Sequence, residues 1–301
     1  MTTLRSSSPR IALVLGSGGV RSVAALGINE TLAQSGLGPD LIVGCSSGAL
    51  FGACIAMGMS GEQGLGAATR LWSPELTQQT RWSAYLELIA PKLMRFDTRF
   101  SLRDARLIRE RVEAAFGAAT FDDLPIPLRV VTTVSATGES CVLSRGRVTD
   151  AVRASMALPF IFPSVEIDGQ RLSDGVISDP LPVAAARDAG AVITLGFRGA
   201  MPRRIDRASR LVAQITTAMI NNLQQARIEA ARASGQRMLH IEIDIDRRVG
   251  LWDTAAMPRI YEAGRRAAQE QMAAIRAMLD APRRAPLTSP LNSSLSSASN
   301  P

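Results

Sequence analysis

The feature that most restricts the possible folds is a short apolar strand that runs directly into a tight turn and then into an apolar helix. Residues 41–50 read LIVGCSSGAL, and the helical pattern extends over 48–59. The central letters match G-x-S-x-G, a pattern in which a serine on a strained strand-to-helix turn exposes its hydroxyl. Cys45 and Ser47 are small, as a tight turn requires. The stretch therefore predicts Ser46 as a nucleophile, favoured by the positive end of the helix that follows it.

Short runs with strand character alternate with helical runs along most of the chain. We predict helices at 22–35 and 48–59, and strands at 10–15, 41–44, 127–136, 139–146, 191–197 and 238–245. The third and fourth strands are joined by Thr137 and Gly138 and predict a strand pair. Strands that alternate with helices favour a largely parallel sheet covered on both faces, which is an α/β layer fold.

Composition places this alternation in one domain with two short tails. The chain has 301 residues, of which 46% are apolar, so it can bury a substantial core. We assign the domain to 10–280 and expect the Ser-, Pro- and Ala-rich tails at 1–9 and 281–301 to be disordered. Three cysteines without a C-x-x-C pair favour a reducing, cytoplasmic setting and argue against a structural zinc site.

The net charge of +7 comes almost wholly from arginine, since Lys92 is the only lysine. A basic chain favours anionic partners such as nucleic acid or a membrane surface. Here the arginines are interleaved with acids, and aromatic residues make up only 4% of the chain, which leaves little for stacking on bases. We interpret the charge mainly as solvated surface and favour lipid head groups over nucleic acid as an anionic partner.

No segment has the form of a signal peptide or a membrane span. The apolar run 11–15 is too short for a signal peptide and leads straight into glycines. The uncharged run 41–61 is long enough to cross a bilayer, but the GCSSG turn interrupts it. A buried strand followed by a buried helix explains that run better.

Two long helical tracts lie outside the alternation. The first covers 82–116, is interrupted by Pro91 and is rich in aromatic residues. The second covers 207–234, with Asp206 as its expected N-cap. Its helical spacing predicts four buried side chains, Leu211, Ile215, Met219 and Leu223. We interpret both tracts as core packing, and the aromatic density of the first also makes it a candidate lid or lipid-contacting surface.

A glycine-rich loop, GSGGVRS at 16–22, joins the first predicted strand to a helix. A dinucleotide-binding fingerprint would need a third glycine where Arg21 stands, and an acid at the end of the second strand, which instead ends in Gly44. An oxyanion hole needs only backbone N–H groups at a helix N-terminus, and the loop satisfies that requirement. A plain glycine-rich turn is the third interpretation.

Two residues compete to accept the proton of Ser46. The first is Asp174, in the stretch SDGVISDPLP at 173–182, where it either presents a carboxylate to a cleft or is a turn residue. The second is His240, the only histidine, and the order Ser, Asp, His is known from α/β-hydrolases. His240 lies within an alternating strand, whereas a triad histidine normally follows its strand, so we favour Asp174. A carboxylate suits this role when burial raises its pKa.

Three segments together resemble the patatin-like lipid acyl hydrolases. LVLGSGGVRSVAALG resembles the glycine-rich oxyanion motif of that family, LIVGCSSGAL its nucleophile elbow, and LSDGVISDPLPV its aspartate segment. Two segments between the elbow and the aspartate segment, FDDLPIPLRVVTTVSATGE and AVRASMALPFIFPSVEIDG, also resemble the corresponding parts of the family. The resemblance covers about residues 10–200 and continues more weakly to about residue 273.

The resemblance implies a patatin-like three-layer fold, with a central, mostly parallel sheet flanked by helices, and a Ser–Asp dyad without histidine. Ser46 would be the nucleophile, Asp174 the general base, and the backbone N–H groups of Gly18 and Gly19 the oxyanion hole. Water would hydrolyse the acyl-Ser46 intermediate. Arg21 matches the basic position after the glycines, as either a structural partner or a head-group contact.

This sequence departs from the family pattern at two positions. Ser22 stands where the family usually has glycine, and Val176 replaces the second glycine after Asp174. A β-branched residue does not easily adopt a positive φ, so a left-handed family backbone at this point would require a different loop here. Activity would then be reduced or specificity shifted. Ser47, beside the nucleophile, is a candidate supporting residue.

These observations lead us to expect a cytoplasmic serine esterase that visits the membrane surface. Its expected substrates are fatty acyl esters of phospholipids or related lipids, and we expect no metal, cofactor or nucleic-acid partner. Two alternatives stay open. An acyltransferase or thioesterase would use the same acyl-Ser46, and a non-catalytic lipid-binding regulatory protein would keep only the fold.

Overall fold

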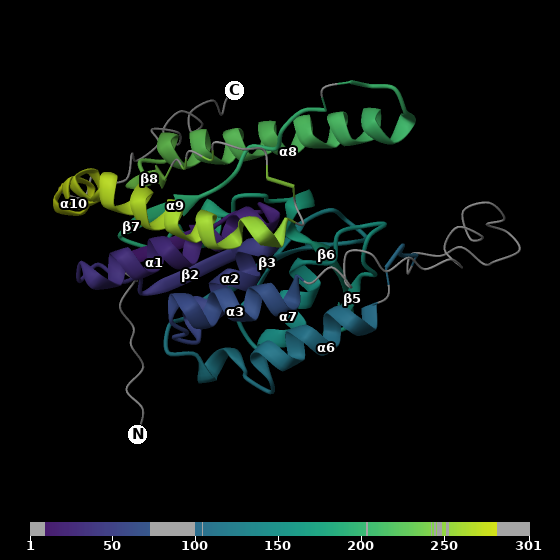
Figure 1. Cartoon of the computed structure of the whole chain (residues 1–301), viewed down its shortest axis with the longest axis horizontal. Coiled ribbons are helices and arrows are strands. Elements are labelled where there is room, and N and C mark those ends of the chain that lie inside the picture. The colour runs from purple at the N-terminus through teal and green to yellow at the C-terminus, as the bar shows by residue number, and fades with distance from the viewer. Residues whose placement is uncertain are drawn as a thin grey trace, which may run out of the picture.

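An eight-stranded sheet forms the middle layer of the computed structural model (Figure 1). The model describes residues 10–281 except for 73–99, 104, 203, 242, 244, 246–248, 251 and 252. The strands are β1 Ile11–Leu15, β2 Leu41–Cys45, β3 Leu128–Val134, β4 Ser140–Leu143, β5 Val165–Ile167, β6 Gln170–Asp174, β7 Ala191–Leu195 and β8 Met238–Ile241.

Five strands, in the order β3-β2-β1-β7-β8, run parallel. β4 and β6 pair antiparallel with β3, and β5 pairs antiparallel with β6. All six strands predicted from sequence are present, and the predicted pair around Gly138 is the β3–β4 hairpin. β5 and β6 are not predicted from sequence, because they are short and carry charged residues.

Helices cover both faces of the sheet. They are α1 Ala24–Gln34, α2 Ser47–Ala56, α3 Gly61–Leu71, α6 Ala105–Phe116, α7 Val148–Ser155, α8 Ala208–Ala233, α9 Met257–Glu270 and α10 Met272–Asp280. In Figure 1, α8 lies on one side of the sheet, and α1, α2 and α3 lie on the other.

The pattern of burial explains why this layered arrangement forms. Every residue of β1 is buried, and alternate side chains enter different cores. Leu13 and Leu15 belong to the larger core, which α1, α2, α7 and α9 share. Ala12 and Val14 belong to the smaller core, together with Ile228 of α8. A strand that is apolar on both faces needs a helical layer on each side, as parallel sheets generally do.

The second long helical tract is confirmed as α8, but burial is wrongly predicted for three of the four apolar residues expected in the core, and the fourth, Leu223, is half-buried. Leu211, Ile215 and Met219 are exposed by 46%, 52% and 67%. The buried residues of α8 come from its second half, so only that half packs on the protein. The N-cap prediction is also wrong: the N-cap is Arg207, and Asp206 instead accepts a hydrogen bond from Arg210.

The predicted aromatic tract at 82–116 lies largely outside the described residues, which resume at Phe100 and include α6. The lid predicted for this tract therefore stays a prediction. The predicted tails also lie outside the described residues, except for position 281. Among the helices that the structure describes, none combines the length and the apolar character that crossing a bilayer requires.

Candidate active site

Ser46 occupies a strained turn between β2 and α2. Its φ is 56° and its ψ is −126°, a backbone conformation that costs a non-glycine residue about 1–3 kcal/mol. Gly48 allows the turn to pack closely, because a Cβ at this position would collide with the carbonyl oxygen of Leu15 in β1. The sharp strand-to-helix turn predicted from G-x-S-x-G is thus present, with Ser46 at the N-terminus of α2.

Ser155, a residue of α7, links this strained turn to the neighbouring strand β3 by hydrogen bonds. The backbone N–H of Ser46 donates to Ser155 Oγ at 2.8 Å, and the Ser155 hydroxyl donates to the carbonyl oxygen of Val131 at 2.7 Å. Ser155 is not among the predicted site residues, although the sequence contains a signal for it. Val148, Val152 and Ser155 fall at helical positions i, i+4 and i+7, so Ser155 is a polar residue on the buried face of α7.

Ser155→Ala is expected to lower kcat by roughly tenfold or more, because the nucleophile loses its positioning contact. The variant should also lose about 1–3 kcal/mol of unfolding free energy, since two buried polar groups lose their partner. Thr149→Val is the matched control on the same helix, where it removes a hydrogen bond to Gly117. If both variants lose stability and keep the wild-type kcat, Ser155 has no positioning role.

β2 and β6 meet end to end along one side of β3. β4 and β6 both pair with Thr132 and Thr133, so they must lie on opposite sides of β3. β2 shares Val131 with β4, so β2 and β6 lie on the same side. β2 ends at Cys45, opposite Val131, while β6 runs the other way and ends at Asp174, opposite Thr132. The residue that follows β2 is therefore brought next to the last residue of β6.

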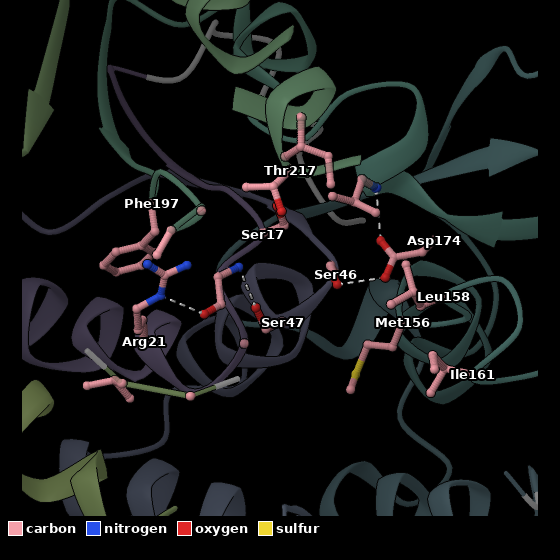
Figure 2. A pocket seen from close by; sticks show the side chains of 18 of the residues that line it. Ser17, Arg21, Ser46, Ser47, Met156, Leu158, Ile161, Asp174, Phe197 and Thr217 are labelled. Carbon is pink, nitrogen blue, oxygen red and sulfur yellow. Dashed lines mark hydrogen bonds between the residues drawn. The ribbon is translucent and has the colours of Figure 1, made fainter. Parts of the chain in front are cut away.

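This arrangement places the side chains of Ser46 and Asp174 in direct contact. The Ser46 hydroxyl donates to Asp174 Oδ2 at 2.8 Å, and the two side chains point toward one another in Figure 2. The Val176 N–H donates to the other carboxylate oxygen at 2.9 Å. Burial raises the pKa of the Asp174 carboxyl from 3.8 to about 7, although these two hydrogen bonds oppose the increase. A carboxyl with this pKa can exchange a proton near neutral pH.

Val176 fits this loop without a left-handed backbone. It lies in a short 3₁₀ turn, Gly175–Ile177, and is not among the described residues with positive φ. The neighbouring residue Gly175 is the one that lies close to other parts of the chain. A Cβ at this position would collide with the carbonyl oxygen of Val131 and lie 3.0 Å from Cys45 Sγ. Glycine is therefore needed at position 175 but not at position 176. The backbone N–H of Val176 orients the Asp174 carboxylate.

Ser22 and Ser47 tie the glycine loop to the elbow. The Gly18 N–H donates to Ser47 Oγ at 3.0 Å, and Ser47 Oγ lies 2.9 Å from Ser22 Oγ. Ser22 Oγ in turn donates to the carbonyl oxygen of Gly16 at 3.4 Å. The serine that departs from the family pattern therefore belongs to a buried network. The Gly18 N–H is engaged by Ser47, so it can serve an oxyanion only by exchanging this hydrogen bond.

Arg21 orients the peptide between Gly18 and Gly19. Its Nε donates to the carbonyl oxygen of Gly18 at 3.2 Å, and its guanidinium lies 5.0 Å from the ring centroid of Phe197. In a trans peptide the N–H points opposite to the preceding C=O, so the Gly19 N–H points away from Arg21. Another guanidinium nitrogen donates to the carbonyl oxygen of Arg198. These contacts give Arg21 a structural role, and its burial lowers its pKa.

A cavity of about 390 Å³ lies beside Ser46 and Asp174, and its size is typical of small-molecule sites. Its polar end holds Ser46, Asp174 and the glycine loop. The apolar lining comes from several elements: Trp72, Met156, Leu158, Ile161, Phe162, Val176, Phe197, Ile220 and Val249. In Figure 2, Ser46 and Asp174 lie between the glycine loop and the labelled residues Met156, Leu158 and Ile161.

The family model of patatin-like phospholipases matches residues 13–187, more than half of the chain. The chain belongs to the patatin-like phospholipase family. The matched range begins in β1 and includes the glycine loop, the elbow, Ser155 and Asp174. The resemblance stated from sequence is therefore confirmed, and so is the α/β fold with a central sheet between helices.

Curated proteins are similar to about two thirds of this chain. An uncharacterized NTE family protein of Mycobacterium tuberculosis is 36% identical over 195 residues, which cover 63% of this chain and 49% of the relative. The patatin-like phospholipase domain-containing protein 7 of Rattus norvegicus is 32% identical over 190 residues, covering 62% of this chain and 13% of that protein. The chain thus matches about half the length, or less, of these relatives.

Among solved structures, VipD from Legionella pneumophila matches with a TM-score of 0.46 and 15% sequence identity, covering 89% of this chain and 67% of that one. ExoU of Pseudomonas aeruginosa, solved in complex with SpcU, matches with a TM-score of 0.43 and 16% identity, covering 92% of this chain and 54% of the other.

His240 lies away from this patatin-like site. It is a residue of β8, and its Nδ1 is 2.8 Å from Thr194 Oγ1 in β7. β8 is separated from β2 by β7 and β1, and strands are spaced by about 4.8 Å. The structure therefore brings Asp174, and not His240, to Ser46.

In the part of the chain that the structure describes, no three acidic, His or Cys side chains gather as a metal site would require.

Proposed function

We propose that this protein is a serine esterase that hydrolyses fatty acyl esters of phospholipids or related lipids. The single observation that carries the proposal is the 2.8 Å contact between Ser46 Oγ and Asp174 Oδ2 at the polar end of an apolar cavity. The contact supplies a nucleophile with its base, and the apolar lining offers a site for an acyl chain. Membership of the patatin-like phospholipase family supports the lipid ester as substrate.

In the first half-reaction, Asp174 takes the proton of Ser46 as Oγ attacks the acyl carbonyl carbon. The carbonyl oxygen becomes an oxyanion, and the Gly19 N–H is the donor best placed to stabilise it, with the Gly18 N–H joining if it leaves Ser47. When the tetrahedral intermediate collapses, the ester C–O bond breaks. The leaving alcohol takes the proton from Asp174, and Ser46 keeps the acyl group.

In the second half-reaction, a water molecule replaces the alcohol. Asp174 takes one of its protons as the water oxygen attacks the acyl-Ser46 carbonyl. Collapse then breaks the bond to Ser46 Oγ, which recovers the proton from Asp174, and the fatty acid leaves. This sequence needs no metal or cofactor.

A reducing compartment and transient contact with membranes complete the proposal. Cys45, Cys54 and Cys141 are all free thiols. Such cysteines suit a cytoplasmic protein, and a lipid substrate would bring the protein to a membrane surface.

Covalent labelling tests the proposed nucleophile. A fluorophosphonate probe is expected to label the wild type and to leave Ser46→Ala unlabelled, because the probe reacts with an activated serine. Ser140→Ala, which replaces an exposed serine in β4, is the matched control and should label like the wild type. A well-folded wild type that is not labelled would point to a non-catalytic binding protein.

Product analysis then separates hydrolysis from transfer. The wild type is expected to release free fatty acid from phospholipid, even when an alcohol or a thiol is added as a competing acceptor. Quantitative conversion of the acyl group into a new ester or thioester would instead identify an acyltransferase.

A further inference from the structure

Most of the exposed large hydrophobic residues in the described part of the chain come from one segment. Six of them come from residues 201–219: Met201, Ile205, Leu211, Val212, Ile215 and Met219. Two more, Phe160 and Ile177, are sequence neighbours of residues that line the cavity. Contiguous exposed apolar surface of this kind usually marks a site of interaction with a protein, a ligand or a membrane.

Four of these residues form a continuous row on α8. Leu211, Val212, Ile215 and Met219 lie within about 100° of one another around the helix axis, because each residue advances the helix by about 100°. We refer to these four residues as the apolar ridge. The opposite face of the helix carries Asn221, Gln224 and Ile228, which are buried.

The apolar ridge lies on the outer face of α8, and the inner face of the same helix lines the active-site cavity. Thr217, Ile220 and Asn221 of α8 line the cavity, and Figure 2 shows the Thr217 side chain beside it. Beyond this point the outer face of α8 changes character: Asn222, Ala226, Glu229, Ala230 and Ala233 replace the large apolar side chains there and are exposed. The ridge is therefore confined to the half of α8 that extends from the cavity to the helix N-terminus.

Positive charge precedes the apolar ridge. Residues 203–210 contain four arginines and a single acid, Asp206, which pairs with Arg210. Arg204 and Arg207 are exposed. Exposed arginines beside an apolar helix face are the combination by which amphipathic helices bind anionic bilayers.

We propose that the apolar ridge of α8, together with the exposed Arg204 and Arg207, is the surface by which this protein binds an anionic lipid bilayer. Apolar side chains would enter the boundary between head groups and acyl chains, while the arginines pair with anionic head groups. Because the inner face of the same helix lines the cavity, this orientation would bring the cavity to within about one helix diameter of the bilayer. The inference rests on the proposed lipid esterase function for its biological role, but binding itself requires no catalysis.

Vesicle flotation tests the surface independently of catalysis. The full chain carrying Ser46→Ala is expected to float with vesicles that contain an anionic phospholipid, and more weakly with purely zwitterionic ones. Adding Ile215→Ser and Met219→Ser should lower the bound fraction by roughly tenfold, because two large apolar groups no longer enter the lipid. Val142→Ser is the matched control: Val142 is exposed by 45% on β4, away from α8, and its replacement should change nothing.

A kinetic comparison in the active protein gives the second readout. Ile215→Ser with Met219→Ser should reduce hydrolysis of vesicle phospholipid and leave hydrolysis of a monomeric short-chain ester unchanged. Equal flotation of the double variant and the wild type would overturn the proposal. So would sedimentation showing that the two substitutions convert a dimer into a monomer, because a second copy would then cover the ridge. Flotation without any hydrolysis would leave the surface intact and reject the esterase function alone.

Discussion

Replacing Asp174 by asparagine is expected to lower kcat/KM for lipid ester hydrolysis by about 10³-fold, within the roughly 10²–10⁴-fold range that general bases contribute. Asparagine has nearly the same shape, so its Oδ1 can still accept the Val176 N–H. The asparagine amide cannot take the proton of Ser46. In the wild type, the Ser46 hydroxyl donates to Asp174 Oδ2 at 2.8 Å. The variant should thus retain the geometry and lose the proton transfer. Titration of released fatty acid from phospholipid vesicles measures the effect.

The pH dependence of the wild type tests the same assignment. A base must be ionised to accept a proton, and burial raises the pKa of Asp174 to about 7. The value of kcat/KM is therefore expected to rise with pH and to reach half of its plateau near pH 7, the pKa of the free enzyme's base. The residual activity of Asp174→Asn should lack this rise.

His240→Ala is the control for the dyad. His240 is the only histidine of the chain, and it lies on β8, which β7 and β1 separate from β2, with Thr194 of β7 as its contact. Its replacement is expected to leave kcat/KM nearly unchanged. A loss comparable to that of Asp174→Asn would show that the two residues act together and would reject a dyad.

The elbow could be predicted from sequence because its physical requirements are local. A buried strand, small neighbours and Gly48 are all visible in ten consecutive residues, and they suffice to place Ser46 on a strained turn. The alternation of strands and helices predicts the layers for the same reason. The family resemblance adds Asp174, which local pattern alone leaves as either a base or a turn residue.

The remaining features of the fold and the site depend on contacts between segments that are distant in the sequence. That β2 and β6 meet end to end follows from the pairing of both with β3, and β6 is too short and too polar to be predicted as a strand. Ser155 reaches the elbow only because α7 packs beside β3. The exposure of Ile215 could not be predicted either, because helical spacing shows that a face is apolar but not how much of the helix meets the core.

Asp174→Asn is also expected to be more stable than the wild type at alkaline pH. The carboxyl has a pKa of about 7 in the folded protein and about 3.9 in an unfolded chain. Between these values the folded protein holds a proton that the unfolded chain has released, so the unfolding free energy of the wild type falls as pH rises. The difference corresponds to roughly 4 kcal/mol, present below about pH 4 and lost above about pH 7. Asparagine does not titrate, so the variant avoids this loss.

Urea unfolding of both proteins at acidic and alkaline pH measures this difference. Asp188→Asn is a control with the opposite sign, because the hydrogen bonds and charge of Arg129 lower the pKa of Asp188. Asp188 is stabilising above its unfolded pKa and loses that effect as pH falls through its folded pKa, so its replacement should destabilise the protein at neutral pH. If the wild type and Asp174→Asn show the same pH dependence, burial does not hold a proton on Asp174. The carboxyl would then be a weaker base than hydrolysis by a Ser–Asp dyad near neutral pH requires.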